Sequence, residues 1–332
     1  MKNRIWPTVK YLLLLSVGLI LLVLAFRGKN LAEMATAIKS ADFSWVFLSI
    51  FFSILANISR AQRWNMLIYP LGHRPSLKNS FAALMAGYLA NLALPRMGEI
   101  SRCAALAQAE KAPMDSLIGT VITERILDLI MLIFCIFLVT ILNFETIGGV
   151  VMQQLIVPAG TKVLALLTSW VFYAVLIGMI AAIIFYKKSK TKKEMPLVKK
   201  LVLFLKGIGA GMKSVFVMKN KGWFLFHTLF IWLMYFLTTY VCFHAIKETS
   251  QLGLMAGLFV LVGGSLGMTA PVQGGIGVYH LLVAKALTFY AIPFTSGLIY
   301  ATIVHSSQVL MVLITGGFSV LYFSLRKNKI NG

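Results

Sequence analysis

The chain alternates long apolar runs with short polar or basic segments. Six of these runs predict helices that cross a membrane, because a span needs about 20 mainly apolar residues. They cover about residues 8–26, 43–59, 117–142, 163–186, 223–243 and 297–323. Two further apolar regions, about 77–110 and 252–292, are interrupted by proline and glycine. We therefore predict an all-α polytopic membrane protein with six full spans and two broken hairpins, which are either re-entrant or spanning.

The broken part of the second hairpin is the stretch 263–280, which contains six glycines, Pro271, Gln273 and His280. Proline removes a backbone donor and glycine permits positive φ, so we expect the helix to stop over 270–277. In hydrocarbon such a break persists only where it is buried in protein or lines a polar cavity. The stretch therefore predicts a site inside the membrane rather than a plain span.

A second broken segment, 95–102, interrupts the first hairpin and reads Pro-Arg-Met-Gly-Glu-Ile-Ser-Arg. The order span, broken hairpin, span thus occurs over 43–142 and again over 223–323. The charge distribution indicates that the first hairpin enters from the cytoplasm and the second from the opposite side, which predicts an inverted repeat. Broken segments at corresponding positions of two inverted halves are typical of a transporter site near the middle of the membrane.

Composition and charge agree with this topology. The 332 residues are 59% hydrophobic with a mean hydropathy of +0.86, which excludes an average soluble domain. The net charge of +21 is spread in short clusters between apolar runs, which argues against a nucleic-acid-binding patch. Under the positive-inside rule 21 basic residues, including those in 60–78, fall on the cytoplasmic side and 6 on the other. Both termini are then cytoplasmic, and we expect the protein in the inner (cytoplasmic) membrane.

The segment 187–221 carries eleven lysines and is predicted to be a cytoplasmic linker between the two halves. Pro196 can start a helix in which Lys199, Lys206 and Lys213 recur every seven residues opposite leucines. Such an amphipathic helix would rest on the anionic lipid headgroups of the inner leaflet. A solvated linker that only orients the spans explains the charge equally well.

Six ionisable residues are predicted at or near membrane depth. They are Arg96, Glu99, Arg102, Glu124, Arg125 and Asp128. A charge at the bilayer centre costs roughly 2.5–3.5 kcal/mol, so such residues pair with one another or line a pathway. Glu124 and Asp128 share a helix face, and we expect two arginines of the first hairpin, Arg96 and Arg102, to face them. The cluster is then either a buried ion-pair network or part of a substrate site.

The substrate interpretation rests on arginine chemistry, because a guanidinium group holds phosphate with two hydrogen bonds. Backbone N–H groups of the glycine turn would add an anion nest from the second hairpin. We therefore expect a site for an anionic lipid headgroup, formed by the six ionisable residues together with Gln273, Gly274, Gly275, Gly277, His280 and His305. Each histidine is more often a hydrogen-bonded helix residue than a ligand or a base.

The sequence carries no nucleotide-binding signature, since it has no P-loop. The three cysteines and five histidines do not have the spacing of metal ligands. We therefore expect neither a metal ion nor a cofactor, and we assign no catalytic residue.

Four motifs occur in order along the chain. They are Arg60-x-x-Arg63-Trp64, Pro95-Arg96-x-Gly98-Glu99-x-x-Arg102, Glu124-Arg125-x-x-Asp128 and Pro271-x-x-Gly274-Gly275-x-Gly277. Together they resemble the lysylphosphatidylglycerol synthase transmembrane region, also called the flippase-like family, over about residues 10–325. The resemblance implies a membrane unit that flips an aminoacylated lipid, which a cytosolic synthetase domain makes in bifunctional members. The chain ends about nine residues after its last predicted span, so we do not expect the synthetase activity.

We expect a flippase that moves an anionic or phosphate-bearing lipid across the cytoplasmic membrane, with aminoacylated and glycosylated lipids among the candidates. Two alternatives stay open. One is a membrane-embedded, lipid-modifying transferase that uses Glu124 or Asp128 as a base. The other is a scaffold that docks a separately encoded synthetase or glycosyltransferase through 187–221. The expected partners are membrane phospholipids or lipid-linked substrates, and no nucleic acid.

Overall fold

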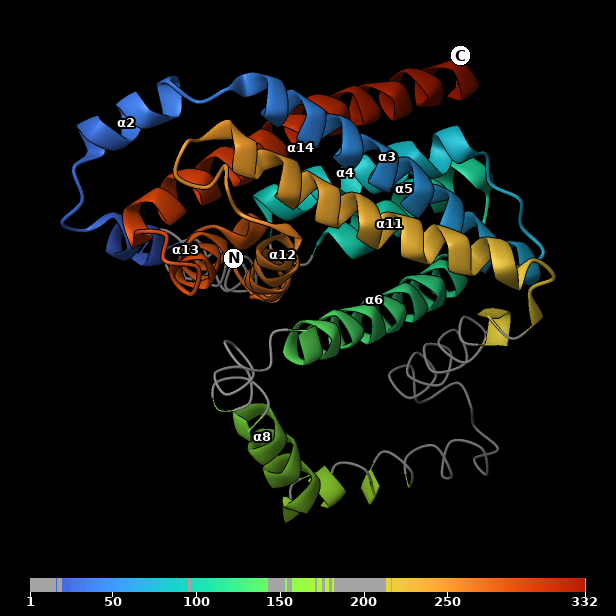
Figure 1. Cartoon of the computed structure of the whole chain (residues 1–332). Helices are drawn as coiled ribbons and strands as arrows, with labels where there is room; N and C mark the ends of the chain where they lie inside the picture. The colour runs from blue at the N-terminus through green and yellow to red at the C-terminus, as the bar shows by residue number, and fades with distance from the viewer. Residues whose placement is uncertain are drawn as a thin grey trace, which may run out of the picture.

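The computed structural model describes a helical protein (Figure 1). It describes residues 16, 20–94, 97–142, 153, 157–170, 172–174, 177–178, 181, 213–215 and 217–331. Within these residues there is no β-strand, which agrees with the predicted all-α class. The helices are α2 (Leu31–Lys39), α3 (Phe43–Ile68), η1 (Tyr69–Leu71), α4 (Leu77–Ala93), α5 (Gly98–Glu110), α6 (Met114–Leu142), α8 (Val157–Thr168), α11 (Lys221–Val241), η5 (Cys242–Ala245), α12 (Leu254–Thr269), η6 (Gln273–Gly275), α13 (Val278–Thr288) and α14 (Phe294–Asn331).

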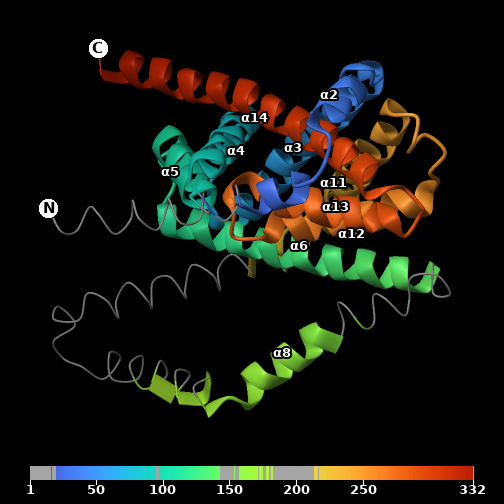
Figure 2. The same ribbon diagram turned by 90° about the vertical axis from the view of Figure 1, so that its left-hand side faces the viewer.

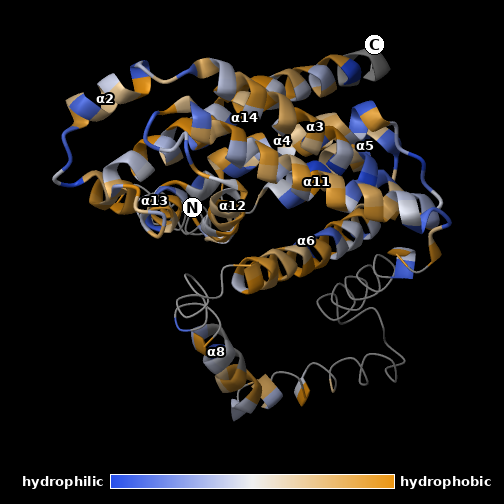
Figure 3. Ribbon diagram, in the orientation of Figure 1, coloured by the Kyte–Doolittle hydropathy of each residue, from blue (hydrophilic) through white to orange (hydrophobic). Residues whose placement is uncertain are grey.

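Four helical stretches in the described part of the chain are long and apolar enough to cross a membrane. They are Phe43–Leu71, Met114–Leu142, Lys221–Ala245 and Phe294–Arg326. Most of the predicted span at 8–26, part of the span at 163–186 and most of the basic segment 187–221 lie outside the described residues. Large apolar side chains are exposed along α6 and α14, for example Phe137 and Phe318. Most of α6 is coloured as hydrophobic in Figure 3. Such faces suit contact with lipid, and they support a multi-pass membrane protein.

One predicted boundary is wrong. The apolar run that begins at residue 43 was expected to stop before Arg60, yet α3 continues to Ile68. Its start is fixed by Asp42, whose Oδ1 accepts a hydrogen bond from the Ser44 N–H at 2.9 Å. The helix continues because Arg60 and Arg63 are buried against other helices, so their charge does not end it.

The two broken regions form helical hairpins. In the first, α4 packs against α5, and in the second α12 packs against α13. The four arms are shorter than the four long helices of the described chain. The second break follows the predicted chemistry, because Gly274, Gly275 and Gly277 all have positive φ between α12 and α13.

The order long helix, hairpin, long helix occurs twice in the described chain, as α3, α4–α5, α6 and as α11, α12–α13, α14. The long first helices, α3 and α11, lie side by side (Figure 1). Each hairpin also packs against the last helix of the other half, with α4 on α14 and α12 on α6 (Figure 2). The hairpins are therefore held at the centre by both halves. The inverted relation of the halves stays a prediction.

Candidate functional site

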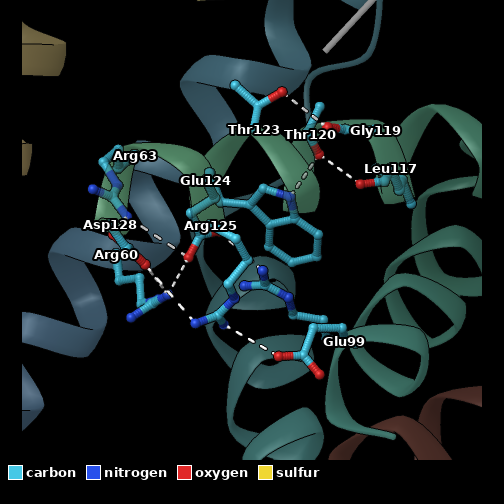
Figure 4. A network of polar contacts seen from close by, with 12 residues as sticks. Arg60, Arg63, Glu99, Leu117, Gly119, Thr120, Thr123, Glu124, Arg125 and Asp128 are labelled. Carbon is cyan, nitrogen blue, oxygen red and sulfur yellow. Dashed lines mark hydrogen bonds and ion pairs between the residues drawn. The ribbon is translucent and has the colours of Figure 1, made fainter. Parts of the chain in front are cut away.

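Three helices of the first half bring their ionisable side chains to one place (Figure 4). Glu124 and Asp128 lie one turn apart on α6 and therefore face the same way. From α3 come Arg60 and Arg63, and from the hairpin arm α5 comes Arg102. We call this group, together with Glu99 and Arg125, the arginine–carboxylate cluster.

Glu124 is at the centre of the cluster and is fully buried. Its Oε1 lies 2.5 Å from Arg60 Nη2, and its Oε2 lies 3.1 Å from Arg102 Nη2. A buried carboxylate is tolerated only when opposite charges compensate its lost hydration. Glu124 therefore ties α6 both to α3 and to the hairpin arm α5.

Asp128 is held by the two arginines of α3. Its Oδ2 lies 2.7 Å from Arg60 Nη2, and its Oδ1 lies 2.7 Å from Arg63 Nη2. Arg60 Nη1 also donates to the hydroxyl of Tyr235 on α11 at 2.8 Å. The second half thus contributes one side chain to the cluster.

An aromatic ring holds the arginine of the hairpin. Arg102 is buried, and its Cζ lies 4.8 Å from the centre of the Trp64 ring, within the range of a cation–π contact. The indole N–H of Trp64 donates to Thr120 Oγ1 on α6 at 2.9 Å. Trp64 therefore holds the guanidinium group of Arg102 while Glu124 pairs with its Nη2.

The cluster has more positive than negative charge. Its ion pairs join four arginines to three carboxylates, which leaves one positive charge in surplus. Arg63 and Arg102 each keep buried Nε and Nη1 donors that make no hydrogen bond within the described residues. Arg125 is the most accessible arginine, with a side chain 43% exposed, and its pairs are long, 3.5 Å to Glu99 and 3.9 Å to Asp128.

The second half contributes an uncharged group around the glycine turn. His305 Nε2 on α14 lies 2.7 Å from the carbonyl oxygen of Gly274. A carbonyl only accepts, so the imidazole must donate from Nε2. His280 on α13 is buried beside it, with ring centroids 4.8 Å apart, and its Nδ1 has no hydrogen-bond partner in the described structure. The Nε2 of buried Gln273 is also without one.

The two groups meet through α4 rather than through polar contacts. A Cβ at Gly274 would lie 2.9 Å from Leu92 Cδ2, so the glycine turn rests on the last turn of α4. Within the described residues no hydrogen bond or ion pair joins the arginine–carboxylate cluster to Gly275, Gly277 or the two histidines. The expected pairing of Arg102 with a carboxylate of α6 is present, while Arg96 lies outside the described residues.

Sequence reasoning missed Arg60 and Arg63, which it assigned to a cytoplasmic loop under the positive-inside rule. Instead these two arginines are the main partners of Glu124 and Asp128. Their spacing of three residues within one helix was the available signal, because it places both on one face. In the described part of the chain no group of three or more metal-binding side chains converges.

Comparison with known proteins places the chain among membrane proteins. A family model described as the lysylphosphatidylglycerol synthase TM region matches residues 11–316. The chain is 24% identical over 312 residues to a UPF0104 membrane protein of Methanocaldococcus jannaschii, and the match covers 85% of each chain. No solved structure matches it.

Proposed function

This chain belongs to the family of the lysylphosphatidylglycerol synthase TM region, and we propose that it moves a phosphate-bearing lipid from one leaflet of the membrane to the other. The family is consistent with a role in membrane lipid handling. The arginine–carboxylate cluster is the observation that carries the proposal, because it combines buried charge with a surplus of guanidinium groups. Ionisable residues within a membrane protein usually mark the path of a substrate.

The surplus arginine is Arg125. Three arginines are committed to Glu124 and Asp128 at 2.5–3.1 Å, whereas Arg125 is half-exposed and has only long pairs. A phosphate group offers two oxygens in the geometry that a guanidinium fork binds best. In this proposal the headgroup phosphate displaces Glu99 from Arg125, and the buried arginines keep the carboxylates in place.

The remaining site residues have supporting roles in the proposal. Arg96 precedes α5 and is proposed as a second phosphate ligand, although it lies outside the described residues. The glycine turn, with Gln273, Gly274, Gly275 and Gly277, rests on α4 and forms the other end of the headgroup's path. We also propose the cytoplasmic membrane as the location, with both termini in the cytoplasm.

A transferase with Glu124 or Asp128 as a base receives less support, because arginines occupy both carboxylates. Residues 263–267 match the Gly-x-Ser-x-Gly pattern of hydrolases. Ser265, however, lies inside α12 rather than on the strand-to-helix turn that exposes such a nucleophile. The scaffold alternative depends on 187–221, which lies almost wholly outside the described residues.

The test is lipid translocation in liposomes that contain the purified protein and fluorescent phosphatidylglycerol. We expect Arg125→Ala to slow translocation about tenfold or more, because a charge-assisted hydrogen bond contributes about 1.5–3 kcal/mol. The matched control is Leu129→Ala, one turn further along the exposed face of α6. Equal rates for both variants, or no translocation by the wild-type protein, would overturn the proposal.

A further inference from the structure

A cavity of about 570 Å³ is formed mainly by the second half, and none of the residues that line it belongs to the arginine–carboxylate cluster. Residues on α13 and α14, the turn between α12 and α13, and the helical residues 20–26 line it. Its volume lies in the range of about 300–1,000 Å³ that is usual for ligand pockets.

The walls of this cavity are mainly apolar, and the polar residues among them are His280, Thr302, His305 and Ser306. Leu310 and Leu313 at the rim are about half exposed on a helix that is long enough to span the membrane. Phe26, Ile276 and Val309 continue the apolar wall. No aspartate, glutamate, lysine or arginine is among the described residues that line the cavity, in contrast to the arginine–carboxylate cluster.

His280 is one of the polar residues that line the cavity. It is only 5% exposed and has an Nδ1 without a hydrogen-bond partner in the described structure. The neighbouring His305 already donates a hydrogen bond from Nε2 to the Gly274 carbonyl. A buried polar group left without a partner is costly, so the imidazole of His280 favours a hydrogen-bonding ligand in this cavity.

We propose that this cavity binds one acyl chain of a membrane lipid, with the ester carbonyl at its end accepting a hydrogen bond from the imidazole of His280. The apolar walls favour a hydrocarbon chain and disfavour an ionised headgroup, which would lose its hydration without a counter-charge. The exposed leucines of α14 lie at the opening of the cavity, on a helix face that suits contact with lipid chains. The inference deepens the proposed function, because the occupant would be the tail of the lipid whose headgroup engages Arg125, but acyl-chain binding does not require translocation.

The experiment uses the full chain in nanodiscs of phosphatidylcholine and phosphatidylglycerol that contain a phosphatidylglycerol with a diazirine in one acyl chain. Photolabelled peptides are then located by mass spectrometry. We expect label on α14 around residues 302–313 and on residues 20–26. Val309→Trp fills the cavity and should reduce this label about tenfold, whereas Val320→Trp, on an exposed face of the same helix, should not.

A second variant tests the hydrogen bond. It also keeps the inference testable if Val309→Trp does not fold. His280→Phe keeps an aromatic ring but removes the donor. It should reduce labelling by an ester-linked probe roughly three- to tenfold and leave an ether-linked probe unchanged, since one neutral hydrogen bond is lost.

The inference would be overturned if label were spread evenly along α14 and did not change in Val309→Trp. It would also be overturned if His280→Phe reduced labelling by the ester-linked and the ether-linked probe equally. If labelling follows expectation while liposomes show no translocation, the proposed function fails and the acyl-chain site stands. Translocation without cavity labelling would overturn the acyl-chain site and leave the proposed function standing.

Discussion

The two hairpins of this protein break at corresponding places but satisfy their polar groups in opposite ways. Beside the first hairpin, buried arginines and carboxylates compensate one another across α3, α5 and α6. At the second, the break is uncharged, and a histidine of α14 donates to the carbonyl of Gly274. The first hairpin is thus accompanied by buried charged side chains, whereas the second contains a turn that needs glycine.

This difference indicates a division of labour. The charged side can recognise an ionised headgroup, because its surplus arginine, Arg125, is accessible. The neutral side suits the uncharged part of the same molecule, because no aspartate, glutamate, lysine or arginine is among the described residues that line its cavity. Each of the following substitutions alters either the charged cluster or the neutral glycine turn.

The largest effect is expected from Glu124→Gln. The change leaves Arg102 buried without its paired carboxylate, and breaking such a buried pair costs about 3–5 kcal/mol. Equilibrium unfolding in mixed micelles measures the loss. Glu99→Gln is the control, because Glu99 is a third exposed and its pair with Arg125 is long. Similar stability of the two variants would mean that the cluster does not hold the helices together.

On the neutral side, Gly274→Ala should destabilise the protein by about 1–2 kcal/mol through its positive φ alone, with crowding of Leu92 in addition. The same unfolding measurement applies. Gly317→Ala is the control, since Gly317 lies within α14, is not among the glycines with positive φ and has open space around it. An unchanged stability in Gly274→Ala would contradict the requirement for glycine at this turn.

A smaller effect is expected from His305→Phe, which keeps a ring but removes the hydrogen bond to the Gly274 carbonyl. The loss should be about 1 kcal/mol in unfolding free energy. His244→Phe serves for comparison, because the His244 ring packs against Trp45 with centroids 4.8 Å apart and makes no hydrogen bond within the described residues. If both histidine variants lose the same stability, ring packing and not the hydrogen bond supports the turn.

The broad fold could be predicted from the sequence because hydropathy decides it. The runs at 117–142 and 297–323 lie within α6 (Met114–Leu142) and α14 (Phe294–Asn331), and the glycine-rich break lies between α12 and α13. The all-α class and the membrane-spanning helices follow from the same property. These features depend on local sequence, so no knowledge of tertiary contacts was needed.

The partners within the site could not be predicted in the same way. Arg60 pairs with a carboxylate 64 residues away, and His305 with a carbonyl 31 residues away. The positive-inside rule assigns Arg60 and Arg63 to a loop, because it counts charge without knowing that α6 supplies counter-charges. Only the packing of α3 against α6 shows that these arginines belong to the cluster.

The most direct test of the central claim compares two cargoes in the same liposomes, fluorescent phosphatidylglycerol and a fluorescent glycolipid without phosphate, for the wild-type protein and Arg125→Ala. Recognition of phosphate by Arg125 predicts that the variant moves phosphatidylglycerol about tenfold more slowly than the wild type. The ratio of variant to wild-type rate for the glycolipid should stay near one. An equal loss for both lipids, or no loss for either, would contradict the claim that this cluster recognises a lipid phosphate.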